Sequence, residues 1–326
     1  MKLGKNLSYF LLLIIVFVVP IFIRSEYYLH VLILCAMNII LASSLRAIST
    51  VGQISLGHAG FMSIGAYTSG ILVMKLGLST YVAILLGGVA AMALAAVIAY
   101  PVTRVRTVYF AMLTLFLGEV IRLVITEGRE ITGGTSGLIN IRPLETISIL
   151  GLHIDFATRL PNYYFVLVFM LMTLLFLYWV DRSYIGMTFK AIAQDESLAA
   201  STGINVARLK AIIFCIGCCI AGLAGGFYAH YMSVLTPDSF GLFTSIYILI
   251  YVVIGGARRF AGPIVGALIL TLIPEAFRTL REYQPFIFVS VLFLVVFLLP
   301  GGLSDLVERI KVQRSSTYQA RVKTDA

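Results

Sequence analysis

Charged residues are scarce in this chain. Only 12% of its 326 residues are Asp, Glu, Lys or Arg, whereas 60% are hydrophobic, and a soluble domain usually carries about twice that charged share. With a mean hydropathy of +0.99, almost the whole chain needs an apolar solvent. This excludes an ordinary water-soluble enzyme and predicts a protein that crosses a lipid bilayer several times.

Cysteines are also few, and all four lie in apolar runs, so a disulfide-stapled secreted fold is not expected. Cys215, Cys218 and Cys219 share one helical face by their spacing. No acidic or imidazole side chain lies within a turn of them. We therefore interpret them as small apolar packing residues and not as a thiol site.

Sequence motifs for catalysis are missing. The chain contains no G-x-x-x-x-G-K-[ST] phosphate loop, no H-E-x-x-H zinc motif and no G-x-S-x-G nucleophile motif. We therefore expect a chain that is not an enzyme and that itself binds no metal and no cofactor. The net charge of +9 is typical of the cytoplasmic loops of a membrane protein and does not indicate a nucleic-acid partner.

Apolar segments long enough to cross about 30 Å of hydrocarbon occupy most of the chain. Ten spans are predicted. Eight full spans and two broken or re-entrant segments are the alternative, because the eighth and tenth are short and the third is rich in Gly and Ser. The first has no small-x-small cleavage site after it, so we expect it to be retained. The ten are 7–23, 27–48, 53–74, 80–101, 107–127, 161–180, 209–232, 243–257, 263–281 and 285–300.

The distribution of Lys and Arg predicts the orientation. With the amino terminus inside, 16 of the 24 Lys and Arg lie inside and the other 8 outside, which favours cytoplasmic positions for both termini. We expect a single transmembrane domain over 1–326. It would carry an outer loop at 128–160, a cytoplasmic segment at 181–208 and a basic cytoplasmic tail at 301–326.

A short helix is predicted in the cytoplasmic segment, because Ala191 to Ala200 favours helix and Gly203 supplies a stop. So short an amphipathic helix has no core of its own and must bury its apolar face against the membrane, the spans or another protein. The expected apolar face comprises Phe189, Ile192, Ala193 and Ala199 or Ala200. The side chains expected to stay in water are Lys190, Asp195 and Glu196.

Several motifs, in the same order, resemble the permeases of branched-chain amino acid ABC transporters, and the resemblance extends from about residue 30 to 300. The motifs at 195–205 (DESLAASTGIN), 221–226 (AGLAGG) and 236–240 (TPDSF) are shared features of these permeases. Others resemble the LivM side of the LivH/LivM family more than its partner. They are 52–61 (GQISLGHAGF), 64–67 (IGAY), 132–134 (TGG), 255–256 (GG) and 261–263 (AGP).

This resemblance implies an all-α, type II-like ABC importer permease in a bacterial inner membrane, carrying branched-chain or other hydrophobic amino acids. The implied partners are a second, LivH-like permease, two ATP-binding subunits that use the ATP, a periplasmic or lipid-anchored amino-acid-binding protein, and membrane lipid. The residues implied to couple to the ATPase are Asp195, Glu196, Ala199, Ala200 and Gly203. The alternative is that this helix lies at the interface and contacts only lipid.

Two charged residues lie inside the fifth predicted span. Glu119 and Arg122 share one helical face, and Glu119 lies roughly 16 Å along the helix from Val108, past the midplane toward the outside. A lone charge there costs about 2.5 to 3.5 kcal/mol, so it should face protein or water and pair with Arg122. The pair is interpreted either as a polar constriction that senses a zwitterionic cargo or as a structural ion pair. Glu275 and Arg278 repeat the spacing.

A second candidate group lies at the start of the third predicted span. Gln53, Ser55 and His58 stand among glycines that would let a helix break and turn backbone N–H groups toward a carboxylate. The alternative is that the small residues simply let neighbouring helices approach.

Two rival functions remain open. An ion-coupled secondary transporter would need no ATPase and should carry a titratable residue within the membrane, such as Glu119. An ABC permease for urea, amides or aromatic acids is the other. A membrane enzyme or scaffold is remote, because the catalytic motifs are missing.

Overall fold

The computed structural model describes residues 25–105, 107–149, 152–156 and 158–276, together with Phe17, Pro20, Ser290 and Phe293. The predicted spans at 7–23 and 285–300 fall almost entirely outside the described residues. The predicted tail at 301–326 and Arg278 also lie outside them.

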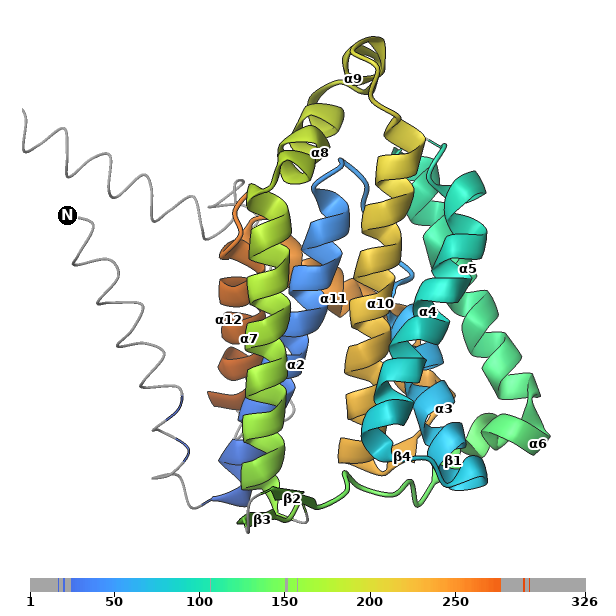
Figure 1. The fold of residues 1–326 in the computed structure, drawn as a ribbon, viewed down its shortest axis with the longest axis vertical. Helices are drawn as coiled ribbons and strands as arrows, with labels where there is room; N and C mark the ends of the chain where they lie inside the picture. The colour runs from blue at the N-terminus through green and yellow to red at the C-terminus, as the bar shows by residue number, and fades with distance from the viewer. Residues whose placement is uncertain are drawn as a thin grey trace, which may run out of the picture.

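Long apolar helices make up most of the described chain (Figure 1). Six of them are long and apolar enough to cross a membrane, and a seventh such stretch runs over Pro237–Gly255. The all-α, multi-pass architecture is therefore confirmed, whereas the number of ten spans is not. The six are α2 Glu26–Ser49, α3 His58–Leu76, α4 Thr80–Val102, α5 Thr107–Glu127, α7 Arg159–Arg182 and α10 Val206–Met232.

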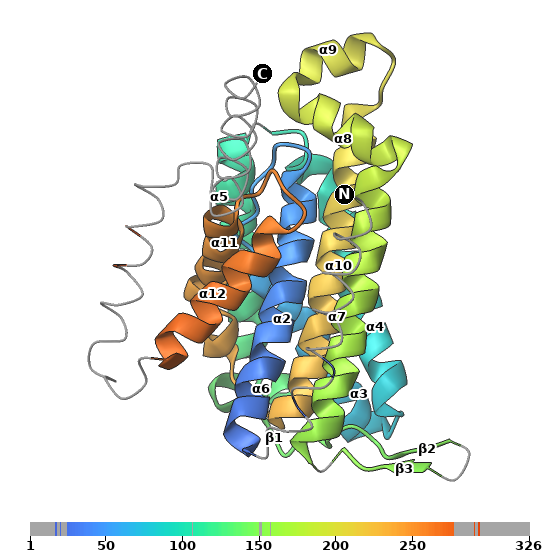
Figure 2. The ribbon, with the colours of Figure 1, turned by 90° about the vertical axis from the view of Figure 1, so that its left-hand side faces the viewer.

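Two shorter helices complete the bundle. The 3-10 helix η2, Pro237–Phe240, leads into α11, Leu242–Gly255, and α12, Gly262–Ala276, follows after a short turn. The helices α8, Tyr184–Gln194, and α9, Glu196–Ser201, project beyond the bundle at one end, which we call the α9 end (Figures 1 and 2).

The opposite end, which we call the strand end, carries short strands that the sequence did not predict. In the predicted outer loop lie α6, Arg129–Thr132, the 3-10 helix η1, Gly134–Ser136, and the strands β1, Leu138–Ile139, β2, Ile147–Ile149, and β3, Leu152–Ile154. β1 pairs antiparallel with β4, Val234–Leu235, with Leu138 opposite Leu235. β2 and β3 form an antiparallel hairpin. Gly133, Gly134 and Gly137 all have positive φ, as tight turns require.

The helices α3, α4 and α10 pack so closely that glycine is required where they cross. A Cβ atom at Gly65 would overlap the carbonyl oxygen of Gly222, and one at Gly225 would overlap the carbonyl oxygen of Met62. A Cβ at Gly87 would lie 2.6 Å from the carbonyl oxygen of Gly65. Small residues that let backbones meet are the main way in which helices associate in lipid. These three helices therefore form a tightly packed hub, which we call the glycine hub.

Helices outside the glycine hub differ in how much of their surface is covered. α2 is almost enclosed by its neighbours, whereas few residues of α5 are buried. Large apolar side chains such as Val97 on α4, Phe116 on α5 and Trp179 on α7 are exposed. Such surfaces are expected where helices meet lipid or another membrane protein.

We predict that Gly225→Ala lowers stability by about 1 to 3 kcal/mol, because the added methyl group overpacks the contact between α3 and α10. The apparent melting temperature in detergent measures the effect. Gly241→Ala is the matched control, since a Cβ at Gly241 meets nothing closer than 3.4 Å. Equal melting temperatures for the two variants would contradict the close packing.

Candidate functional site

The chain between α2 and α3 is not helical and turns back into the bundle (Figure 1). The predicted span at 53–74 therefore starts with non-helical chain, and α3 begins at His58. The backbone N–H of Leu56 donates to Thr114 Oγ1 on α5 at 3.0 Å, and that of Ala59 donates to Ser245 Oγ on α11 at 3.1 Å. These hydroxyls satisfy N–H groups that a helix start leaves open, so the break is held from two sides. We call 51–57 the helix break.

Polar side chains gather at the helix break. Gln53, Ser55 and His58 are completely buried. The Gln53 amide donates to the carbonyl oxygen of Thr103 at 3.2 Å, and His58 Nε2 lies 2.7 Å from Ser44 Oγ on α2. The structure therefore brings Ser44 beside His58, a contact that the sequence did not indicate because Ser44 stands in an apolar run.

Several atoms of this group have no hydrogen-bond partner within the described residues. They are Gln53 Oε1, Ser55 Oγ, His58 Nδ1 and, on α2, Ser43 Oγ. Each buried polar atom left unpaired costs about 1 to 3 kcal/mol, and such atoms are rare enough to need an explanation. Unpaired atoms grouped around a helix break can pair with a polar ligand or with water.

The expected ion pair on α5 is present. Arg122 Nε lies 2.8 Å from Glu119 Oε2, and both side chains are partly exposed. The sequence missed a third member, Asp238 of η2, whose Oδ1 lies 3.2 Å from the Arg122 guanidinium. The resemblance had drawn attention to the motif at 236–240, but nothing in the sequence indicated that it lies beside α5. The predicted partner pair of Glu275 cannot be compared, because Arg278 is not described; the Tyr27 hydroxyl donates to Glu275.

The two candidate groups are separate but share the same neighbouring elements. Thr114, which holds the helix break, and Glu119 both lie on α5, roughly 7.5 Å apart along the helix axis. Asp238 and Ser245 lie on the continuous η2–α11 stretch. A polar route between the groups would therefore run along the seam between α5 and α11. That these residues line a path for cargo stays a prediction.

The predicted helix over Ala191 to Ala200 is interrupted. Asp195 is extended, with φ −154 and ψ 112, and its carboxylate accepts hydrogen bonds from the N–H groups of Ser197 and Leu198 at 2.8 and 3.0 Å. A continuous helix is therefore wrong, because the Asp195 side chain caps a new helix. Gly203 has φ +86 just beyond the end of α9, as expected for a helix stop.

The apolar face expected for the cytoplasmic segment at 181–208, which we call the coupling segment, is correct only in part. Phe189, Ile192 and Ala199 are buried, whereas Ala193 and Ala200 are exposed. Lys190, Asp195 and Glu196 are exposed, as expected. Glu196 forms an ion pair with Lys210, which is buried at the start of α10. Leu198, which the sequence did not single out, is 64% exposed near the tip of the segment.

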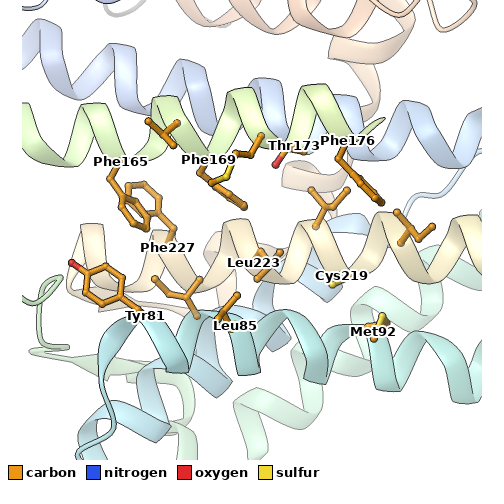
Figure 3. A pocket seen from close by; sticks show the side chains of 15 residues that line it. Tyr81, Leu85, Met92, Phe165, Phe169, Thr173, Phe176, Cys219, Leu223 and Phe227 are labelled. Atoms are coloured by element: carbon orange, nitrogen blue, oxygen red, sulfur yellow. The ribbon is translucent and has the colours of Figure 1, made fainter. Parts of the chain in front are cut away.

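An apolar groove of about 630 Å³ lies between α4, α7 and α10 (Figure 3). Phe165, Phe169 and Leu223 point into it, and the only hydroxyl groups in its lining belong to Tyr81 and Thr173. An ammonium or carboxylate group placed there would lose its hydration without gaining a partner. The groove therefore suits apolar groups such as lipid chains and is not a site for a zwitterion.

Residues 27–299 match the model of the family described as branched-chain amino acid transport system / permease component. The chain belongs to this family.

The curated relatives agree with this assignment. The chain is 30% identical over 273 residues to the high-affinity branched-chain amino acid transport system permease LivM of Salmonella typhimurium and of Escherichia coli, with 77% of this chain and 64% of each relative covered. It thus spans about two thirds of their length. It is 24% identical to LivH of Escherichia coli, with 78% of this chain and 86% of the relative covered. It is 26% identical to the ribose import permease RbsC of Bacillus subtilis, with 82% of both covered. No solved structure matches the chain.

We predict that Asp195→Ala destabilises α9 by about 1 kcal/mol, because two N–H groups lose their side-chain cap. Hydrogen exchange of the amides at 196–201 should become roughly fivefold faster. Ser197→Ala is the control, since it keeps the N–H that Asp195 binds. Unchanged exchange in the Asp195 variant would show that the cap does not hold α9.

Proposed function

We propose that this chain is one transmembrane subunit of an ATP-driven ABC importer that carries branched-chain or other hydrophobic amino acids across a bacterial inner membrane. The observation that carries the proposal is the projecting α8–α9 segment on a chain of this permease family. A segment with an exposed apolar tip and an internally anchored base suits docking to another protein. ATP would be used by partner subunits, and this chain would hold no cofactor.

The proposed assembly follows from the distribution of surfaces and charges. We expect the α9 end and both termini to face the cytoplasm, which the excess of Lys and Arg on that side favours, and the two ATP-binding subunits to dock there. A second, LivH-like permease and lipid cover the exposed apolar faces, such as that of α5. A periplasmic or lipid-anchored binding protein delivers the amino acid to the strand end.

Three observations favour this assembly and cargo over other transport functions. An ion-coupled transporter should carry a titratable residue within the membrane that is available to the coupling ion, but Glu119 is paired with Arg122 at 2.8 Å. The LivM relatives are also more similar to the chain than the ribose permease is. The polar route along α5 and α11 offers groups of both signs, as a zwitterion requires.

Leu198 is a better position than Glu196 for testing ATPase docking. A charge reversal at Glu196, Glu196→Arg, would place a second positive charge beside buried Lys210, so a loss of docking could not be separated from a loss of folding. We predict that Leu198→Asp reduces co-purification of the ATP-binding subunits by at least about tenfold, because a charge replaces an apolar anchor at the contact.

Leu76→Asp is the matched control for this docking experiment. Leu76 is 67% exposed, closely similar to Leu198, but lies at the opposite end of the bundle. It should leave co-purification intact. If both variants retain the ATP-binding subunits equally, the tip of α9 is not the docking surface, and the segment contacts only lipid.

Ser55 tests the cargo path. Its buried hydroxyl has no partner among the described residues, so Ser55→Ala should leave the melting temperature unchanged or raise it. If cargo pairs with this hydroxyl during passage, the KM for uptake rises by about tenfold, the equivalent of one hydrogen bond.

Ser69 is the matched control for Ser55. It is equally buried, but its hydroxyl lies 2.8 Å from His230 Nε2, so Ser69→Ala should lower the melting temperature. A Ser55→Ala protein that is less stable and has an unaltered KM would assign Ser55 to packing and remove it from the path.

A further inference from the structure

The base of the coupling segment is joined to the end of α7 by more than the peptide chain. A Cβ atom at Gly186 would overlap the carbonyl oxygens of Val180 and Asp181, so α8 packs directly on the last turn of α7. Lys190 Nζ donates to the Asp181 carbonyl oxygen at 3.3 Å and also lies 3.3 Å from Asp181 Oδ1. The first two turns of α8 and the end of α7 are therefore packed together as one unit.

Arg46 connects this unit to two further elements. It lies in the last turn of α2, is 4% exposed, and its guanidinium lies 3.5 Å from Asp181 Oδ1. Arg46 Nε donates to the carbonyl oxygen of Ala257 at 3.2 Å, and its charge lies 5.4 Å from the centre of the Phe260 ring. Ala257 and Phe260 belong to the turn between α11 and α12. One buried arginine thus joins α2, α7 and the α11–α12 turn.

Static stability is a poor explanation for this arrangement. Burying an arginine costs several kcal/mol, and ion pairs in apolar surroundings commonly only offset that cost. The half-exposed Lys190 adds little to stability. Asp181 holds both cations at 3.3 to 3.5 Å, longer than the 2.7 to 2.9 Å typical of a strong charge-assisted hydrogen bond. Asp181 Oδ1 therefore lies near both cations and forms a short hydrogen bond with neither of them.

The coupling segment has a second anchor, and the two reach different parts of the bundle. Glu196 at the start of α9 pairs with Lys210 on α10, which belongs to the glycine hub. Lys190 instead contacts Asp181, Asp181 contacts Arg46, and Arg46 donates a hydrogen bond to the α11–α12 turn. From there α11 carries Ser245, whose hydroxyl holds the first turn of α3 at the helix break.

We propose that Arg46, Asp181 and Lys190 form the joint that transmits movement of the ATPase-docked segment to α2 and to the α11–α12 turn. They are positioning residues, because none of them touches cargo or nucleotide. When the segment moves, the shared Asp181 carboxylate changes its balance between Lys190 and Arg46, and the α11–α12 turn follows Arg46. This inference rests on the proposed function, since it needs an ATPase acting on the segment.

The experiment measures amino acid taken up per ATP hydrolysed by the complete transporter in proteoliposomes. Lys190→Gln removes the exposed member of the joint and should fold. We expect ATP hydrolysis and assembly to persist while uptake per ATP falls by about fivefold or more, the lower end of usual coupling between linked sites. Lys190→Arg restores the charge and should restore the ratio.

Arg258→Gln is the matched control. Arg258 is an exposed cation beside Ala257 in the same α11–α12 turn, and its removal should leave uptake per ATP unchanged. A structural role for Lys190 would lower uptake and hydrolysis together at a constant ratio, and that result overturns the joint. A wild-type assembly with no ATP-driven uptake at all would instead overturn the proposed function, and the joint with it.

Discussion

The need to pair every backbone N–H and C=O group inside lipid governs this structure. Helices satisfy that need within themselves, so any departure from helix must be enclosed and supplied with partners. The helix break is such a departure, and its N–H groups find Thr114 on α5 and Ser245 on α11. The positions of α5 and α11 around α3 are therefore fixed by the same hydrogen bonds that permit the break. At this break, irregular backbone lies beside the buried polar side chains of Gln53, Ser55 and His58.

The helix α3, which follows the helix break, is held in place by its close packing in the glycine hub. Because α3, α4 and α10 touch backbone to backbone at Gly65, Gly222 and Gly225, they have little freedom to separate or slide. Packed cores respond to a push by discrete rearrangement and not by gradual deformation. The ion pairs of Arg46 and Arg122 lie on elements outside the hub, namely α2, α5, α7 and η2.

Local sequence patterns predicted the parts of the fold that depend on local chemistry. Continuous hydrophobicity located the apolar helices α2, α3, α4, α5, α7, α10, α11 and α12, and the pairing of Glu119 with Arg122 followed from their spacing of three residues. The cap at Asp195 could also have been predicted, because an Asp followed by a short helical run is a common helix start.

The remaining features depend on residues far apart in the chain. The start of α3 is set by Ser245, 186 residues away from Ala59, and Asp238 reaches Arg122 across 116 residues. The strands β1 and β4 have only two residues each, too few for an alternating pattern to show. Buried hydroxyls such as Ser44 gave no signal, because serine in an apolar run is equally typical of close helix packing. Predicting these features required knowing which helices are neighbours.

Polar groups occur in this bundle in two distinct states, and the difference bears on how selectivity and movement can be divided. At the helix break, the side chains of Gln53, Ser55 and His58 retain atoms without a hydrogen-bond partner among the described residues. These atoms can form hydrogen bonds with a ligand. At the joint, Arg46 is surrounded by a carboxylate, a carbonyl oxygen and an aromatic ring, so the hydrogen-bonding capacity of Arg46 is used within the protein, although Asp181 Oδ1 meets two cations without a hydrogen bond to either. A side chain with unpaired hydrogen-bonding atoms can discriminate between ligands. A side chain whose partners lie on several helices can instead fix the positions of those helices relative to one another. Under the proposed function, recognition and transmission would fall on different residues, and α11 would connect them because Ser245 lies at one place and the turn to α12 at the other.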